Sequence, residues 1–115
     1  MIVGIGVDLV DISRFEDKLA KTPKLLERLF SPAEAEAPLK TLAGRFAAKE
    51  ALIKALGGSD GISWQEVEIS KNNDGKPMIQ TVGQTSETLK AAGVTNLHLS
   101  ISHDAGMAVA MVVAE

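Results

Sequence analysis

The segment Thr41–Leu56, TLAGRFAAKEALIKAL, decides the fold that this chain is expected to adopt. Its apolar residues recur at helical spacing, and the pair Gly57-Gly58 that follows is a common signal for the end of a helix. The segment therefore predicts a long helix with one apolar face that packs on the rest of the molecule. That face consists of Leu42, Phe46, Ile53 and Leu56, with Leu52 at one edge.

The chain ahead of this helix predicts a strand and then several short helices. Residues 1–7, MIVGIGV, are apolar at every non-glycine position and mostly β-branched, which is typical of a strand buried on both faces. Two glycines within this strand indicate that another backbone or a ligand approaches it closely. Short helices are expected from about 13 to 21, over 24–30, and from Ser31-Pro32 up to an interruption at Pro38.

Beyond the long helix the apolar period changes to two, which is the period of a strand. Residues 64–70 alternate in this way, Asn72–Gly75 is a strong turn signal, and 77–82 are expected to form the return strand. A short helix over 86–92 and strands over 97–102 and 107–114 complete the chain. Because helices gather in the first half and strands in the second, the sequence predicts an α+β fold. We expect a single two-layer domain over residues 1–115, with helices packed on a largely antiparallel sheet.

Composition sets the size of the core and excludes several classes of function. The 115 residues amount to 12.1 kDa, the size of one ordinary domain, and 45% of them are apolar but only 3% aromatic. The core must therefore be built from small and branched aliphatic side chains, and no aromatic platform is left for stacking nucleic-acid bases. The formal net charge of −3 also argues against a general nucleic-acid binder.

The lack of cysteine excludes disulfides, thiolate zinc sites and cysteine nucleophiles. No apolar run approaches the ~20 residues of a membrane span. The first eight residues have neither the basic region nor the small-residue cleavage site of a signal peptide. We therefore expect a cytoplasmic protein that neither enters nor binds a membrane.

Two acidic residues are candidate metal ligands. Asp8 follows the first strand and precedes a helix, where it serves either a ligand or the turn itself. Glu50 shares a helix face with Phe46 and Lys54, and the order of Glu50 and Lys54 also suits an ordinary surface ion pair. Together, Asp8 and Glu50 would give a hard-oxygen site suited to Mg²⁺, which water and phosphate oxygens would complete. Such a site is typical of metal-assisted phosphoryl transfer.

Basic residues and a histidine form a second group of candidates. Lys49 falls inside the apolar stripe of the long helix, so it either extends along its stem to water or meets an anion. With Arg45 and Lys54 it would give a phosphate-binding cluster. His103 ends a strand before a turn, where it is either a ligand or an ordinary hydrogen-bonded residue. Lys76, at the exit of the predicted hairpin turn, either reaches an anion or is simply solvated.

A basic stripe is spaced along the first helical region. Its members, Arg14, Lys18, Lys21, Lys24 and Arg28, follow one another in steps of three or four residues, so a continuous helix would place them on one face. Pro23 is expected to break this helix, and the two pieces could still present one basic face. In a protein of net charge −3 this stripe is a candidate docking surface for an acidic partner. The alternative is a normal charged face, because Glu16, Asp17 and Glu27 are interspersed.

Four short motifs, in order along the chain, carry a family resemblance. They are Gly4–Ile12 (GIGVDLVDI), Gly44–Lys54 (GRFAAKEALIK), Asp74–Pro77 (DGKP) and Leu99–His103 (LSISH). The first is similar to an amino-terminal G-x-D strand, the second to the signature W-x-x-K-E-(A/S)-x-x-K, and the last to a carboxy-terminal S-(I/L)-(S/T)-H. On these motifs the chain resembles, over essentially its whole length, the holo-acyl carrier protein synthases, the small type of 4′-phosphopantetheinyl transferase. One departure is Phe46, where many relatives carry tryptophan.

The resemblance implies an enzyme that transfers the phosphopantetheine arm of coenzyme A to a serine of an apo-acyl carrier protein and releases 3′,5′-ADP. It implies that Asp8 and Glu50 hold Mg²⁺ and that Lys54 contacts the phosphates. Either Glu50 or a metal-activated water would accept the serine proton. The coenzyme A site implied by the resemblance is lined by Arg45, Lys49, Lys54, Gly75, Lys76, Pro77 and His103. The implied surface for the carrier protein comprises Arg14, Lys18, Lys21, Arg28 and Phe46.

The resemblance further implies a homotrimer that supports fatty acid biosynthesis, with its sites between subunits. Asp8 and Glu50 would come from one chain, and His103 with the Gly75-Lys76-Pro77 turn from its neighbour. A second hypothesis is a non-catalytic α+β module that docks an acidic protein through its basic first helix. An unrelated nucleotide-binding enzyme is not supported, because no G-x-x-x-x-G-K-(S/T) loop or G-x-G-x-x-G fingerprint occurs. The sequence leaves open whether the carrier is a free protein or a domain of a larger synthase, and whether acylated coenzyme A is accepted.

Overall fold

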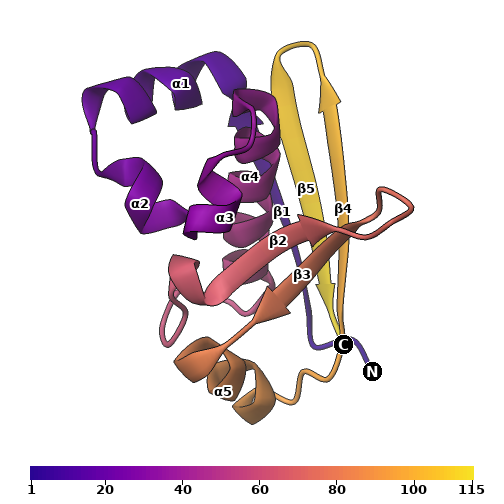
Figure 1. The fold of residues 1–115 in the computed structure, drawn as a ribbon. Helices are drawn as coiled ribbons and strands as arrows, with labels where there is room; N and C mark the ends of the chain where they lie inside the picture. Colours follow the sequence, from indigo (N-terminus) through magenta and orange to yellow (C-terminus); the bar gives the residue numbers. More distant parts are fainter.

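A long helix packed on a three-stranded antiparallel sheet forms the centre of the computed structural model, which describes residues 1–115. The helix is α4 (Leu39–Ala55), and the strands lie in the order β1 (Gly4–Asp11), β5 (Met107–Ala114), β4 (Leu97–Asp104) (Figure 1). The α+β prediction is confirmed. The long helix was predicted from Thr41, but it begins two residues earlier, directly after Pro38, which occupies the N-cap.

Small side chains allow the helix and the sheet to lie close together. On α4, Ala43, Ala47, Ala51 and Ala55 recur every fourth residue, and all of them are buried. On β5, the buried residues alternate along the strand: Ala108, Ala110, Val112 and Ala114. The low aromatic content of the sequence is therefore matched by an interface built from alanine and valine.

The two glycines of β1 allow this strand to approach the backbone of α4 closely. A Cβ atom on Gly4 would lie 1.8 Å from the carbonyl oxygen of Ala55, and one on Gly6 would lie 1.8 Å from that of Ala51. The close approach predicted from these glycines is confirmed. The prediction that β1 is buried on both faces is wrong, because the alternate residues Ile5, Val7 and Leu9 are 53–62% exposed on the side away from α4.

Three short helices connect β1 to α4 and lie beside the upper half of α4 in Figure 1. They are α1 (Ile12–Lys21), α2 (Leu25–Leu29) and α3 (Pro32–Ala35). A side chain caps two of them at the N-terminus: the Arg14 amide donates to Asp11 Oδ1 (3.1 Å), and Ser31 forms a capping box with Glu34. The helices predicted over 13–21 and 24–30 and after Ser31-Pro32 are all present.

The remaining strands form a separate hairpin, β2 (Val67–Lys71) and β3 (Pro77–Thr81), rather than extending the main sheet. The predicted start of this strand at Trp64 is wrong, because Trp64–Glu66 form a 3₁₀ turn. Helix α5 (Gly83–Ala91) begins earlier than predicted, because the Glu66 carboxylate accepts hydrogen bonds from the Gln84 and Thr85 amides at its start (3.2 and 3.0 Å). None of the helices combines the length and the apolar character needed to cross a membrane.

Candidate functional site

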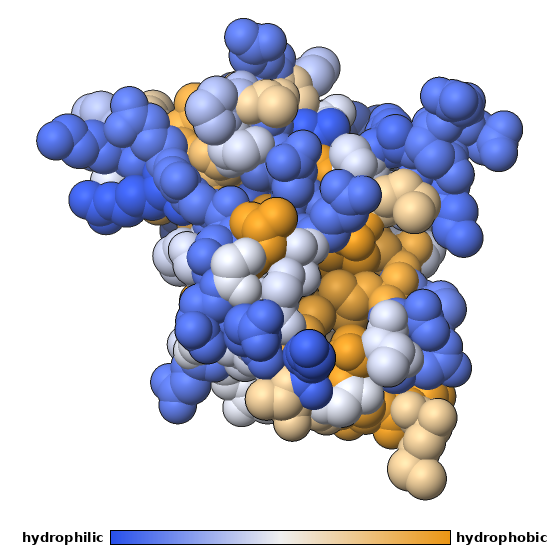
Figure 2. Space-filling view, turned by 60° about the horizontal axis from the view of Figure 1, so that its bottom comes forward, coloured by the Kyte–Doolittle hydropathy of each residue, from blue (hydrophilic) through white to orange (hydrophobic).

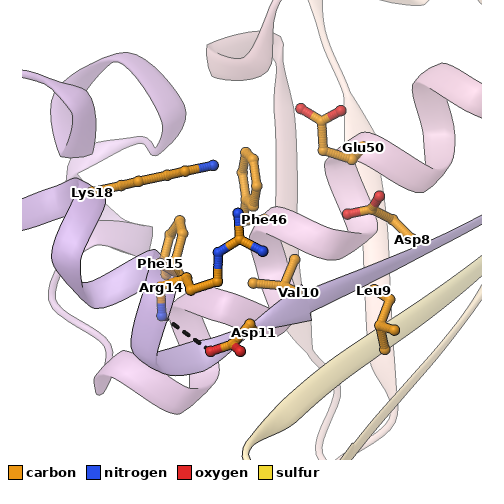
Figure 3. Close-up of a pocket in the computed structure, with 9 residues that line it drawn as sticks. All are labelled: Asp8, Leu9, Val10, Asp11, Arg14, Phe15, Lys18, Phe46 and Glu50. Carbon is orange, nitrogen blue, oxygen red and sulfur yellow. Dashed lines mark hydrogen bonds between the residues drawn. The ribbon is translucent and has the colours of Figure 1, made fainter.

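A pocket of about 330 Å³ lies where β1, α1 and α4 meet. The carboxylates of Asp8, from β1, and Glu50, from α4, lie on one side of it in Figure 3, and Arg14 and Lys18 reach in from α1. Phe46 lies between these two groups. The pocket therefore joins candidates that sequence analysis had assigned to metal binding and to carrier docking.

Packing of β1 on α4 positions the two carboxylates. Gly4 lies against the Ala55 carbonyl and Gly6 against that of Ala51, so β1 runs antiparallel to α4. Asp8, two residues further along the strand, therefore lies closer to the N-terminal end of the helix than Gly6 does. Partial burial raises the pKa of the Glu50 carboxyl, and the nearby Asp8 carboxylate raises it further. Lys54 and Lys18 partly offset this rise. Two carboxylates close enough to repel one another in this way form an environment that favours a cation.

The ammonium of Lys54 pairs with Asp8 rather than with Glu50. Its Nζ lies 2.9 Å from Asp8 Oδ1 and 3.1 Å from the carbonyl oxygen of Val7. The ordinary ion pair between Glu50 and Lys54, which the sequence had left as an alternative, is not formed. Lys54 is thus held at the edge of the carboxylate pair, where a positive charge would meet an incoming phosphate.

The donor set fits Mg²⁺ better than it fits a transition metal. No three His, Cys, Asp or Glu residues converge in a way that could enclose an ion. The pair Asp8 and Glu50 offers only hard oxygen ligands. Mg²⁺ is usually bound by one or two carboxylates together with water and substrate phosphate oxygens, and this site leaves room for both.

Aromatic stacking holds the helical wall of this pocket. The ring of Phe46 stacks on Phe15 at a centroid distance of 5.1 Å, and Phe15 is itself only 2% exposed. This contact fixes α1, and with it Arg14 and Lys18, beside α4. Lys21 is exposed further along α1, and Arg28 is exposed on α2. The basic residues are therefore spread over one helical region of the surface.

A second pocket, of about 180 Å³, lies between the start of α4, the β2–β3 hairpin and the end of β4. Of the predicted coenzyme residues, it brings together Arg45, Gly75, Pro77 and His103. It also contains polar residues that sequence analysis missed: Thr41, Ser70 and Lys71. Two of these could have been found from the predicted hairpin register, because Ser70 and Lys71 pair with Met78 and Pro77.

His103 is fixed by a backbone contact across the second pocket. Its Nε2 lies 3.0 Å from the carbonyl oxygen of Lys40, to which it donates a hydrogen bond, and Nδ1 has no partner within the chain. The imidazole lies against Gly44, where an added Cβ would come within 2.9 Å of Nε2. The glycine of the Gly-Arg-Phe motif is therefore needed to accommodate the histidine of the last motif.

Three predicted coenzyme residues lie outside the second pocket. Lys54 is one of them, and it contacts the Asp8 carboxylate instead. Lys76 lines a smaller neighbouring pocket together with Pro77 and residues of β4. Lys49 points into the interior, where its Nζ contacts Glu34 Oε1 at 2.7 Å and its side chain is 0% exposed. Of the alternatives for Lys49, the anion is the correct one, but this anion is a carboxylate of the chain itself. Lys49 therefore does not line the pocket.

Trp64 is a further residue that sequence analysis missed. Its indole Nε1 is buried and completes no hydrogen bond of normal length within the chain. It nevertheless lies close enough to Glu50 to lower the pKa of that carboxyl, against the effect of burial. The sequence carries no signal that the Trp64 N–H lies beside Glu50, because Trp64 was predicted only as the first residue of a strand.

The two pockets open on different sides of α4. Glu50, in the first, and Arg45, in the second, are five residues apart, which places them roughly 140° apart around the helix axis. Within one chain, the carboxylate pair and the second pocket therefore cannot contact the same group of a ligand.

Comparisons with known proteins agree with this arrangement. The family model of the 4′-phosphopantetheinyl transferase superfamily matches residues 4–111. A holo-[acyl-carrier-protein] synthase of Clavibacter michiganensis is 55% identical over 115 residues, which cover 100% of this chain and 97% of that protein. The crystal structure of the holo-[acyl-carrier-protein] synthase of Neisseria meningitidis matches with a TM-score of 0.92 and 34% identity, covering 100% and 99% of the two chains. That of Helicobacter pylori, in complex with coenzyme A, matches with a TM-score of 0.84 and 37% identity, covering 96% and 99%. The resemblance read from the sequence motifs is thus confirmed, and the chain belongs to the 4′-phosphopantetheinyl transferase superfamily.

Proposed function

We propose that this protein is a holo-acyl carrier protein synthase, which transfers 4′-phosphopantetheine from coenzyme A to a serine of an apo-acyl carrier protein. In this reaction the serine Oγ–P bond forms, the bridging P–O bond of the pyrophosphate breaks, and 3′,5′-ADP leaves. The single observation that carries the proposal is the pairing of Asp8 and Glu50 in one pocket, in a chain with full-length synthase relatives. We infer that it acts in the cytoplasm in support of fatty acid biosynthesis, as the resemblance implies.

Asp8 and Glu50 are the residues that would hold Mg²⁺. When bound, this ion neutralises charge that develops on the pyrophosphate oxygens. The position of Lys54, 2.9 Å from Asp8 Oδ1, supports a role for its ammonium at the same phosphate group. Among the carboxylates of the pocket, Glu50 has the raised pKa, which suits it to accept the serine proton.

The second pocket would hold the nucleotide end of coenzyme A. Arg45 supplies a guanidinium that can bind a phosphate in a bidentate manner. The loop at Gly75 and Pro77 and the free Nδ1 of His103 supply further contacts. Because the carboxylate pair lies on a different side of α4, a single coenzyme molecule needs a second chain to bridge the two pockets.

This separation supports a homotrimer with sites shared between subunits. The outer face of β1 exposes Ile5, Val7 and Leu9, and the neighbouring β5 adds Met111 (46% exposed). Exposed apolar side chains form a continuous area on the right-hand half of Figure 2. Contiguous apolar surface of this kind usually marks an interface, and a second copy of the chain is the occupant that would also complete the divided site.

The basic residues around the first pocket support its use as a docking surface. Arg14 and Lys18 lie at the rim, with the half-buried Phe46 between them and the carboxylates. Lys21 and Arg28 extend the positive surface along α1 and α2. An acidic carrier helix placed here would bring its serine toward Glu50. The hypothesis of a purely non-catalytic docking module is less favoured, because it leaves the carboxylate pair without a role.

Mass spectrometry of an apo-acyl carrier protein incubated with this protein, coenzyme A and Mg²⁺ tests the proposal. A mass gain equal to one phosphopantetheine group is expected. A carrier whose acceptor serine is replaced by alanine should gain no mass. An unchanged mass for the native carrier would contradict the enzymatic function. Running the assay with free carriers, with carrier domains and with acylated coenzyme A would define the substrate range.

A further inference from the structure

A buried ion pair between Glu34 and Lys49 has no part in the chemistry described so far. The two side chains are 2% and 0% exposed, and the distance from Lys49 Nζ to Glu34 Oε1 is 2.7 Å. Lys49 precedes Glu50 on α4, whereas Glu34 lies on the short helix α3. Buried ion pairs often stabilise a fold no better than apolar residues would. We therefore ask which other groups the Glu34–Lys49 pair holds in position.

All three hydrogens of the Lys49 ammonium have acceptors. Besides Glu34, Nζ donates to the carbonyl oxygens of Leu29, at 2.6 Å, and Trp64, at 2.9 Å. It also lies 5.2 Å from the centroid of the Phe30 ring. Burial lowers the pKa of Lys49, and the Glu34 carboxylate opposes this effect. Lys49 therefore serves to fix the Glu34 carboxylate rather than to bind a ligand.

The side chain and the backbone of Glu34 each accept a hydrogen bond from a residue of the second pocket. Its Oε2 accepts the backbone N–H of Ile69 at 2.9 Å, and its backbone carbonyl accepts Arg45 Nη1 at 3.3 Å. Ile69 and Arg45 both line that pocket. Strand β2 pairs only with β3, so the Ile69 N–H lies on an edge that no other strand satisfies. Glu34 thus replaces the missing strand at this position.

We propose that Glu34 is a positioning residue for the nucleotide pocket. Its buried carboxylate, which Lys49 holds in place, fixes β2, and its backbone carbonyl holds the Arg45 guanidinium. The inference rests on the proposed function for its ligand, the 3′-phosphorylated adenine nucleotide of coenzyme A. The β2–β3 hairpin carries Ser70, Lys71 and the turn at Gly75, which are all pocket residues. Releasing β2 would therefore displace one wall of the pocket and leave the carboxylate pair of the other pocket undisturbed.

The test uses the double variant E34Q/K49M, which removes both buried charges together. The glutamine amide has a single acceptor oxygen, so it cannot accept from Ile69 and also replace the other contacts of the carboxylate. The Kd for 3′,5′-ADP, measured by calorimetry, and the KM for coenzyme A are expected to rise about 10-fold, as when a supporting contact of a ligand group is lost. The kcat at saturating coenzyme A should stay within about 2-fold of the native value. Hydrogen exchange at the Ile69 amide should accelerate.

A stability control separates positioning from general loosening of the fold. Leu89→Ala removes a buried side chain from α5, no residue of which lines either pocket. If Leu89→Ala lowers the Tm as much as E34Q/K49M does, it should still bind 3′,5′-ADP with the Kd of the native protein. Equal weakening in both variants, or native binding by E34Q/K49M, would overturn the positioning role. The single variant E34Q gives the same comparison should the double variant not fold.

The same measurements keep the inference distinct from the function on which it rests. A native protein that neither binds 3′,5′-ADP nor modifies the carrier would overturn the proposed function, and the inference with it. A native protein that does both, with a double variant whose kcat falls while its KM is unchanged, would overturn the inference alone. That result would place the effect of Glu34 at the reacting groups instead of at the nucleotide.

Discussion

The carboxyl of Glu50 carries most of the chemistry proposed at the scale of single residues. Glu50→Gln keeps the size of the side chain and removes its charge, so metal binding and proton acceptance should both be lost. We expect transfer to fall by at least about 100-fold, the size of effect seen when one group that stabilises a transition state is removed. Carrier binding, measured by calorimetry, should change less than about 2-fold, because Arg14 and Lys18 remain in place. Glu87→Gln, at an exposed position on α5, is the matched control. Near-native transfer by Glu50→Gln would remove Glu50 from the mechanism.

The raised pKa of Glu50 also predicts how stability depends on pH. Because its pKa lies above the ordinary value of 4.5 in the folded protein, the folded state retains a proton that the unfolded chain loses first. Stability should therefore fall as the pH rises from about 4.5 through the raised pKa, and above it the charged Glu50 is unfavourable. At pH 8 without metal, Glu50→Gln should melt at a higher temperature than the native protein, because the variant has no charge at this position. The difference should be only a few degrees, because solvent screens this half-buried group. The difference should vanish near pH 4. Mg²⁺ should raise the Tm of the native protein alone, and an equal rise in both proteins would contradict the metal site.

At the scale of elements, the contact between β1 and α4 determines where Asp8 lies. Gly6→Ala would place a methyl group 1.8 Å from the Ala51 carbonyl oxygen. Because this oxygen belongs to the helix backbone and cannot rotate away, the strand must move. We expect a loss of about 3 kcal/mol in the free energy of unfolding, together with weakened Mg²⁺ binding. Gly58→Ala is the control, because no atom lies within 4 Å of its added Cβ, and it should change stability by less than about 0.5 kcal/mol. Denaturant titration measures both. A tolerated Gly6→Ala would show that the close approach is not required.

Local signals predicted most of the elements, and the failures occurred where partners are distant in sequence. The Ser31-Pro32 helix start and the turn before Pro77 each depend on neighbouring residues, and they were predicted correctly. Residues 1–7 are apolar at every non-glycine position, and this pattern does not reveal that Ile5 and Val7 lie on an exposed face of the folded chain. Whether the hairpin joins the main sheet is decided by long-range packing, which a strand period does not report.

The candidate site divides in the same way. Spacing on α4 alone indicated that Glu50 and Phe46 share a face, and the two line one pocket. The inward direction of Lys49 could not be predicted, because its carboxylate partner lies 15 residues away on a short helix whose sequence signal was the Ser31-Pro32 start. The periodicity did place Lys49 in the apolar stripe, which is correct. The identity of its anion required the tertiary structure.

At the scale of the whole molecule, the exposed face of β1 predicts assembly. Ile5→Glu would place a charge in the centre of that apolar face without altering a residue of either pocket. We expect the variant to sediment as a monomer where the native protein sediments as a trimer, because an unpaired buried charge strongly opposes association. Val82→Glu alters an equally exposed apolar residue (61% against 59%) outside the three-stranded sheet, and it should leave the trimer intact. A monomeric native protein would contradict the assembly.

Mixing two inactive variants tests whether each site is shared between chains. Asp8→Ala removes a carboxylate of one pocket and His103→Ala removes a residue of the other, so each variant alone should be inactive. In trimers formed by unfolding and refolding an equal mixture, a site is complete only where a chain with native Asp8 lies beside a neighbour with native His103. Random assembly produces this arrangement at about one quarter of the sites, so about one quarter of the native activity should return. Asp8→Ala mixed with Glu50→Gln is the control, because one chain supplies both carboxylates to a site and no arrangement restores them. If activity returns in the first mixture and not in the control mixture, the site is divided between two chains. If activity returns in neither mixture, each chain completes its own site.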